Sequence, residues 1–174
     1  SSGFETGDRI VVGAWKASPF GEFTDIMWAK PNGVRVLIAP DQKIAEYVGE
    51  LYTFDEIQIQ EIDVINNVRQ MSLKSDSMNL NFEWSRGWRI PFRRSLFFIA
   101  TVELFFARLL FGTRTHGTTK NNRKEWYAID SVSKIIGGNA IVGGQDIGAI
   151  ASMAEPCKFG FSEAPKKPSS CEVR

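Results

Sequence analysis

The alternation of apolar and polar residues predicts β-strands through the first half of the chain. The clearest pair is 23–30 and 34–39, which are separated by the turn sequence Pro31-Asn32-Gly33. This triplet favours a type I turn in which Gly33 takes a positive φ, so the two strands are expected to form a hairpin. One face of that hairpin would carry Ile26, Trp28, Val36 and Ile38, and the other would carry Asp25, Met27, Arg35 and Leu37.

Further segments extend this pattern. The chain from 56 to 64 alternates with a parity shift near Gln60 or Glu61, which indicates a β-bulge. Residues 68–74 and 78–84 form a second predicted hairpin about the turn 75–77. A short amphipathic helix is expected near 41–51, because its apolar residues recur at helical spacing as Ile44, Val48 and Leu51.

A long apolar helix is predicted at about 91–111. Its run 96–111 carries only Glu103 and Arg108 as charged residues. Each of these charges would cost about 2.5–3.5 kcal/mol at the centre of a bilayer, so a transmembrane span is not expected. We interpret the segment as a core helix wrapped by strands.

These elements predict an α+β fold with a single domain. Its main part would be an antiparallel sheet or partial β-barrel packed against the long helix. A further short helix is expected near 131–136, ending at Gly137-Gly138, whereas Gly143-Gly144 is typical of a hairpin turn. The chain is divided into a flexible amino end at 1–7, the domain at 8–161, and a mobile Lys/Pro/Ser-rich tail at 162–174.

Glu103 is the main candidate functional residue. Apolar neighbours surround it on the predicted helix, and a carboxylate in such surroundings must be paired, protonated or line a polar cavity. One interpretation is a buried ion pair with Arg35 or Arg114. A second is a ligand-facing or catalytic role, and a third is an exposed position.

The loop after this helix contains the densest polar chemistry. His116 is the one histidine of the chain and the natural proton carrier near neutral pH, although a single loop histidine is most often incidental. The other members of this cluster are Arg114, Arg123, Glu125 and Tyr127.

The net charge of +1 hides an uneven distribution along the chain. Residues 41–63 hold seven acids against Lys43, whereas 85–124 holds nine Lys and Arg against Glu103. The basic region lacks a nucleic-acid-binding motif and a zinc-ligand pattern, so neither nucleic acid nor a metal is expected as a partner. No phosphate loop or dinucleotide fingerprint is present either, and no cofactor is predicted.

Two features bear on localisation. Cys157 and Cys171 are interpreted as reduced thiols of a cytoplasmic protein. The segment Trp84–Arg94 interleaves aromatic residues with arginines, which is typical of a chain that contacts a membrane surface. The oligomeric state is left open.

Several phrases of the sequence carry a resemblance. They are Ser18-Pro19-Phe20-Gly21, Thr24-Asp25-Ile26-Met27-Trp28, Tyr52-Thr53-Phe54-Asp55-Glu56, Arg114-Thr115-His116-Gly117 and Arg123-Lys124-Glu125-Trp126-Tyr127. The chain resembles a group of small, uncharacterised actinobacterial proteins with no assigned activity. The resemblance implies a self-contained cytoplasmic domain without a known cofactor, and it assigns no catalytic residue.

Three functions remain as hypotheses. The first is a binding module for a small acidic or amphipathic ligand between the sheet and the long helix, using Trp28, Arg35, Arg114, Arg123 and Glu125. The second is an enzyme in which Glu103 works with His116 or Tyr127 in proton transfer. The third is a peripheral membrane or protein-partner module that acts through Trp84–Arg94.

Overall fold

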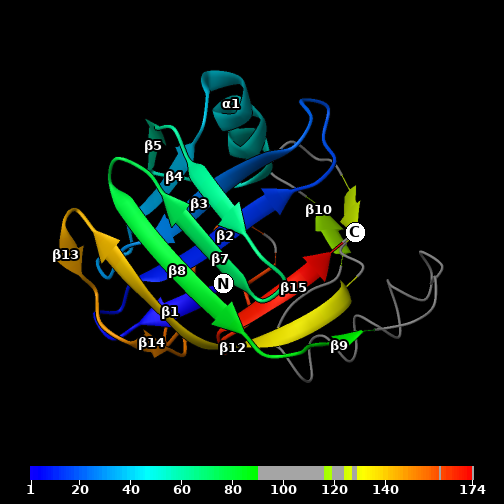
Figure 1. The fold of residues 1–174 in the computed structure, drawn as a ribbon. Helices are drawn as coiled ribbons and strands as arrows, with labels where there is room; N and C mark the ends of the chain where they lie inside the picture. Colours follow the sequence, from blue (N-terminus) through cyan, green and yellow to red (C-terminus); the bar gives the residue numbers. More distant parts are fainter. Residues whose placement is uncertain (90–115, 119–123, 127–128, 161, 174) are drawn as a thin grey trace.

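The computed structural model describes residues 1–89, 116–118, 124–126, 129–160 and 162–173. Within these residues the chain is mainly β, with one helix, α1 (Gln42–Leu51) (Figure 1). Two large sheets account for most of the strands, and a separate antiparallel pair joins β10 (His116–Thr118) to β11 (Lys124–Trp126).

The first sheet has six strands in the order β14-β1-β2-β3-β4-β5. All of its neighbours are antiparallel except β4 and β5, which run parallel because α1 carries the chain from one to the other. The bounds are β1 (Ser2–Phe4), β2 (Arg9–Trp15), β3 (Phe23–Ala29), β4 (Arg35–Ala39), β5 (Glu56–Ile59) and β14 (Ile150–Ala151).

The second sheet has the order β13-β12-β8-β7-β6, and β9 and β15 also pair with β12. The long strand β12 joins β8 along its second half and lies between β9 and β15 along its first half. The bounds are β6 (Asp63–Asn66), β7 (Gln70–Lys74), β8 (Met78–Trp84), β9 (Trp88–Arg89), β12 (Ile129–Val142), β13 (Gln145–Asp146) and β15 (Ser169–Val173).

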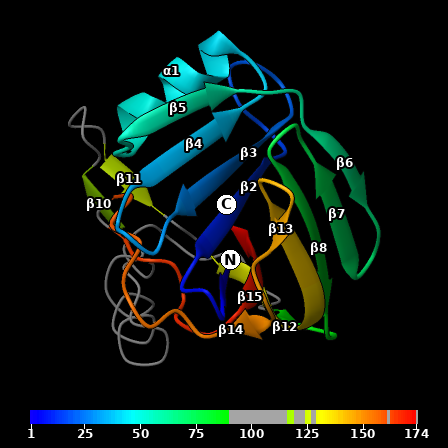
Figure 2. The ribbon, with the colours of Figure 1, turned by 90° about the vertical axis from the view of Figure 1, so that its left-hand side faces the viewer.

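The elements stack in three layers. Figure 2 shows α1 on one side of the first sheet and strands β6 to β8 on the other. One core lies between the two sheets and includes Ile26, Ile38 and Leu80, while a second core lies between the first sheet and α1 and includes Met27, Leu37 and Val48. The first sheet is therefore covered on both faces, and its strands alternate between two apolar environments.

The predicted hairpins are confirmed. Strands β3 and β4 pair with Trp28 opposite Val36 and Ile26 opposite Ile38, and Gly33 has a φ of 89°. Strands β7 and β8 form the second hairpin, and β12 and β13 pair around Gly143-Gly144. Helix α1 covers the predicted segment near 41–51, with the side chain of Asp41 as its N-cap.

The predicted fold class is wrong. The sequence was expected to build an α+β domain in which a sheet packs against a long apolar helix, whereas the described residues form two β-sheets whose apolar faces pack on each other. Two amphipathic sheets can bury their apolar faces without a long helix between them. The predicted helix at about 91–111 lies outside the described residues.

The short helix predicted at 131–136 is also wrong, because these residues belong to β12. The segment contains β-branched residues, which pack well in sheets, and it pairs with β9 and β15. Gly138 has a φ of 150° and lies too close to the backbone of Asn81 to accommodate a Cβ atom. Gly138 therefore permits a close approach to β8, and the Gly137-Gly138 pair does not end a helix.

Three other segments differ in detail from the expectation. The parity shift near Gln60 marks the place where the chain leaves β5 in the first sheet for β6 in the second, so no bulge is needed to explain it. The segments predicted to be a flexible amino end and a mobile tail contain strands β1 and β15, and the backbones of Ser1 and Ser169 hydrogen-bond to each other.

Candidate functional site

The most unusual polar group in the described part of the chain is the carboxyl of Asp25. This residue lies in the middle of β3, and its exposed fraction is 0%. Its Oδ1 accepts a 2.7 Å hydrogen bond from the indole Nε1 of Trp15. Its Oδ2 is buried and has no hydrogen-bond partner among the described residues. Asp25 is therefore a buried acid with only one of its two oxygens satisfied.

The register of β2 and β3 builds this arrangement. Gly13 is the cross-strand partner of Asp25, and Trp15 is the partner of Phe23. A Cβ atom at position 13 would overlap Asp25 Oδ1 and would lie 2.9 Å from Trp15 Nε1. The absence of a side chain at Gly13 thus leaves the space that the carboxyl and the indole occupy.

Burial sets the protonation of Asp25. Desolvation raises the pKa of Asp25 from 3.8 to about 7, although hydrogen bonds from the Trp15 indole and from its own backbone lower it in part. No neighbouring charged side chain shifts this pKa. The group therefore changes charge near neutral pH, and a buried carboxyl with so strongly raised a pKa is a candidate for a functional site.

An aromatic cluster adjoins the Trp15–Asp25 pair. The Trp15 ring stacks on Phe23 with centroids 5.3 Å apart, and Tyr47 of α1 meets Trp15 edge-on at 5.9 Å. Phe20, in the turn between β2 and β3, meets Tyr47 edge-on at 5.4 Å and is 47% exposed. The cluster, which we define as Trp15, Phe20, Phe23 and Tyr47, therefore runs from the buried acid to the surface.

The structure places the predicted ligand residues Trp28 and Arg35 on opposite faces of the first sheet. Trp28 faces the core between the sheets, and its indole donates a 2.7 Å hydrogen bond to Asp8. Arg35 is the partner of Ala29, whose side chain lies in the core beneath α1. These two side chains do not meet in one pocket.

Arg35 forms an ion pair with Asp55, whereas the sequence suggested Glu103 as its partner. Its guanidinium donates to both oxygens of Asp55 at 2.7 and 2.9 Å and to the carbonyl of Lys158 at 3.1 Å. The hydrogen bonds from Arg35 lower the pKa of Asp55 to about 2. An ion pair between Arg35 and Glu103 is therefore not needed to satisfy this guanidinium.

The structure does not describe the side chains of the remaining predicted site residues. Residues Glu103, Arg114, Arg123 and Tyr127 lie outside the described residues. The backbone of His116 pairs with Trp126 in β10 and β11, and Glu125 pairs with Gly117. The interpretations of these residues stay predictions.

One predicted surface feature is partly described. Trp88 in β9 is 81% exposed, and Arg86 and Arg89 on either side of it are exposed as well. A tryptophan is seldom so accessible in a folded domain. The segment Trp84–Arg89 therefore presents an aromatic side chain and two positive charges to the surroundings.

Asp25 could have been found from the sequence. The alternate residues Phe23, Asp25, Met27 and Ala29 place one acid in an otherwise apolar face of a strand. The argument applied to Glu103 applies equally to that acid. The pairing with Trp15 and Gly13 could not be found, because it depends on the register between β2 and β3.

Other kinds of site receive no support from the described residues. They contain no group of three or more His, Cys, Asp and Glu side chains that could hold a metal ion. Their single helix is too short to cross a membrane. Comparison with known proteins finds no matching family model, curated protein or solved structure. The resemblance to actinobacterial proteins and the cytoplasmic localisation stay predictions.

Proposed function

We propose that this protein is a binding module for a small amphipathic molecule with an amine head. The amine would contact Asp25, and the apolar part of the molecule would lie on the aromatic cluster. This proposal keeps the amphipathic ligand expected from the sequence. It replaces an acidic head with a basic one, because the polar group at this place is a carboxyl.

The unpartnered Oδ2 of Asp25 carries the proposal. A buried acceptor without a partner costs about 1–3 kcal/mol, and native proteins leave few such groups unexplained. An ammonium group supplies both the missing donor and a compensating charge, since an opposite charge nearby favours the ionised carboxyl. A bound amine would therefore remove the penalty that the free protein retains.

The aromatic cluster supports the same class of ligand. The faces of Trp, Tyr and Phe rings attract cations, and their area favours an apolar ligand body. Phe20 is the exposed member of the cluster, and its turn is defined by hydrogen bonds between Ser18 and Gly21. We expect a ligand to enter by displacing the Phe20 ring.

Thermal unfolding with benzylamine as the probe tests this function. A ligand that binds only the folded state stabilises it by RT ln(1 + [L]/Kd), so Tm should rise with benzylamine concentration. Benzoate has the same ring and the opposite charge, and it should produce no rise. The effect of benzylamine should be larger at pH 8 than at pH 5, because Asp25 is ionised above a pKa of about 7.

Two variants make the test specific. Asp25→Asn should abolish the benzylamine effect, whereas Asp76→Asn removes an exposed acid in the turn between β7 and β8 and should leave it intact. Stabilisation of the wild type by benzoate, or of Asp25→Asn by benzylamine, would place the ligand elsewhere. No response of the wild type to amines of this size would contradict the proposed function.

The exposure of Trp88 favours a second candidate function, contact with an anionic membrane surface. Interfacial segments combine aromatic side chains with Lys and Arg, as Arg86, Trp88 and Arg89 do. Flotation with phosphatidylcholine vesicles, with and without phosphatidylserine, tests this function. We expect Trp88→Ala to reduce phosphatidylserine-dependent flotation and Ile136→Ala, an exposed residue of β12, to leave it unchanged. Flotation that is absent or independent of Trp88 would contradict it.

The proton-transfer hypothesis still concerns Glu103 with His116 or Tyr127. Glu103 and Tyr127 lie outside the described residues, and only the backbone of His116 is described. A shared proton-transfer step requires the three groups to lie within hydrogen-bond reach or one bridging water.

A further inference from the structure

Exposed apolar side chains gather at one side of the sandwich. In the described part of the chain, many of the large apolar residues that are exposed fall between residues 57 and 68. Here β5 ends the first sheet, β6 ends the second, and the chain crosses from one to the other. The members of this group are Ile57, Ile59, Val64, Ile65 and Val68.

Strand β6 is the more open of the two edges. It pairs with β7 on one side and with no other described strand. All four of its residues are exposed, and Ile65 is 65% exposed. An unpaired edge presents backbone N–H and C=O groups that another extended chain can use.

Strand β5 is less suited to receive a partner. The side chain of Ile57 lies against α1, at 3.8 Å from the position of a Cβ atom on Gly49. The acids at the start of β5 already form salt bridges: Glu56 pairs with Lys30 at 2.9 Å, and Asp55 pairs with Arg35 at 2.7 Å. Its charges are therefore largely balanced within the chain.

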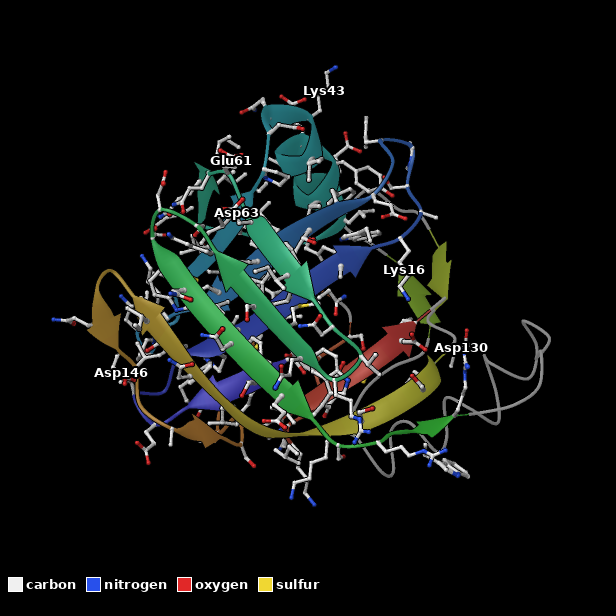
Figure 3. The ribbon with its side chains drawn as sticks, viewed as in Figure 1. Lys16, Lys43, Glu61, Asp63, Asp130 and Asp146 are labelled. Carbon is white, nitrogen blue, oxygen red and sulfur yellow. The ribbon has the colours of Figure 1, made fainter. Side chains whose placement is uncertain are left out.

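The charges beside β6 are less balanced. Glu61 and Asp63 are exposed, and neither is part of a salt bridge between described residues (Figure 3). Lys74 lies across the strand pair from Asp63 and offsets one of the two charges in part. We define Glu61–Asn66 as the acidic edge.

We propose that the acidic edge binds an extended segment of a partner protein in which Lys or Arg alternates with apolar residues. The partner would add a strand beside β6, with main-chain hydrogen bonds along the unpaired edge. On the face that Asp63 and Ile65 share, the methylene stems of its basic side chains would lie on Ile65 and their charges beside Asp63 and Glu61; on the other face its apolar side chains would cover Val64, which is 37% exposed. Charge complementarity at such an edge selects the partner as well as attracting it.

A second copy of this chain fits the edge less well. Pairing β6 with itself would bring additional carboxylates to an edge that already carries Glu61 and Asp63. Acids on an edge strand are a common means of preventing self-association, whereas a basic partner neutralises them.

Binding of two capped peptides tests the proposal, one alternating lysine with valine and the other alternating glutamate with valine. Isothermal titration calorimetry on the full chain should give an affinity at least about tenfold higher for the lysine peptide. Backbone amides of 63–66 should gain protection from hydrogen exchange when that peptide is bound. Ile65→Ser should weaken binding by removing the apolar contact.

Charge reversal supplies the decisive comparison. Glu61→Lys combined with Asp63→Lys should invert the preference, so that the glutamate peptide binds more tightly. Glu155→Lys changes an exposed acid distant in sequence from β6 and should keep the original preference. The proposal would be overturned by equal affinities, by no binding of the lysine peptide, or by a dimer that is lost in Ile65→Ser.

Discussion

At the scale of single residues, the properties of Asp25 arise from three positions. Its place in β3 buries it, Trp15 satisfies one oxygen, and Gly13 leaves room for both groups. Burial disfavours the charged form more than the hydrogen bonds from Trp15 and from the residue's own backbone favour it. The result is a carboxyl that is neutral in mildly acidic solution and charged above neutrality.

The free energy of unfolding should depend on pH through Asp25. Between about pH 4 and pH 7 the folded protein holds a proton that the unfolded chain has released, because folding raises the pKa from 3.8 to about 7. The contribution of Asp25 to the free energy of unfolding is therefore greatest below about pH 4 and is lost as the pH rises through about 7. The loss amounts to up to about 4 kcal/mol for a shift of this size.

Urea unfolding of the wild type and Asp25→Asn at a series of pH values measures this dependence. The asparagine variant should lack the decline, so the stability difference between the two proteins should change across that interval. Parallel curves would show that Asp25 has the same pKa in both states.

Substitution of Gly13 should disrupt the same group. Gly13→Ala places a methyl group against Asp25 Oδ1 and Trp15 Nε1, and we expect a loss of about 1–3 kcal/mol in the free energy of unfolding. Gly137→Ala is the control, because its nearest contact would be 3.8 Å away. In an Asp25→Ala background the cost at Gly13 should fall, since the two sites are in contact. Equal losses in both backgrounds would contradict this cause.

At the scale of elements, the sequence correctly predicted those elements whose conformation depends on residues close together in the chain. The turn Pro31-Asn32-Gly33 specifies the β3–β4 hairpin, because only a few residue types suit its φ values. Helix α1 follows from apolar spacing and from Asp41, whose Oδ1 accepts a 2.9 Å hydrogen bond from the Ile44 amide.

Loss of this cap should weaken the helix measurably. Asp41→Ala leaves an amide of the first turn without its partner and should cost about 1 kcal/mol in the free energy of unfolding. Lys43→Ala, an exposed change in the same turn, is the matched control. Chemical denaturation of both variants provides the measurement, and equal stabilities would show that the cap contributes nothing.

Elements whose conformation depends on distant partners were predicted poorly. Residues 131–136 are too few for periodicity to separate a helix from a strand, and pairing with β9 and β15 decides the outcome. The shift near Gln60 has the same origin, since a change of sheet and a bulge produce the same local pattern.

At the scale of the whole molecule, the two sheets stabilise each other through the core between them. Leu80 of β8 and Ile26 and Ile38 of the first sheet are each 0% exposed in this core. Sequence patterns identify apolar faces, but they do not state which face meets which. The predicted fold class failed at this step, because a long apolar segment was assigned as the partner of the sheet.

Truncation in this core should be costly. Leu80→Ala should reduce the free energy of unfolding by about 2–5 kcal/mol, as expected for a fully buried leucine. Ile136→Ala, which is 57% exposed, should change it by less than about 0.5 kcal/mol. Urea denaturation distinguishes the two, and similar small losses would mean that the sheets do not share a packed core.

The candidate site, like the fold, could be predicted from the sequence only in part. Burial of an acid could be inferred from the alternation of β3, because Asp25 stands among Phe23, Met27 and Ala29. Its half-satisfied state could not, since that depends on the cross-strand positions of Trp15 and Gly13. An exposed aromatic side chain at Trp84–Arg94 followed from only one of the three functional hypotheses, whereas the acidic edge required knowledge of which strand ends the second sheet.

A ¹³C NMR titration of the Asp25 carboxyl, with and without benzylamine, tests the central claim most directly. The account predicts a pKa near 7 in the free protein, and a lower pKa when the amine is bound, because the ammonium stabilises the carboxylate. A pKa near 4 in the free protein, or a value that benzylamine leaves unchanged, would contradict it.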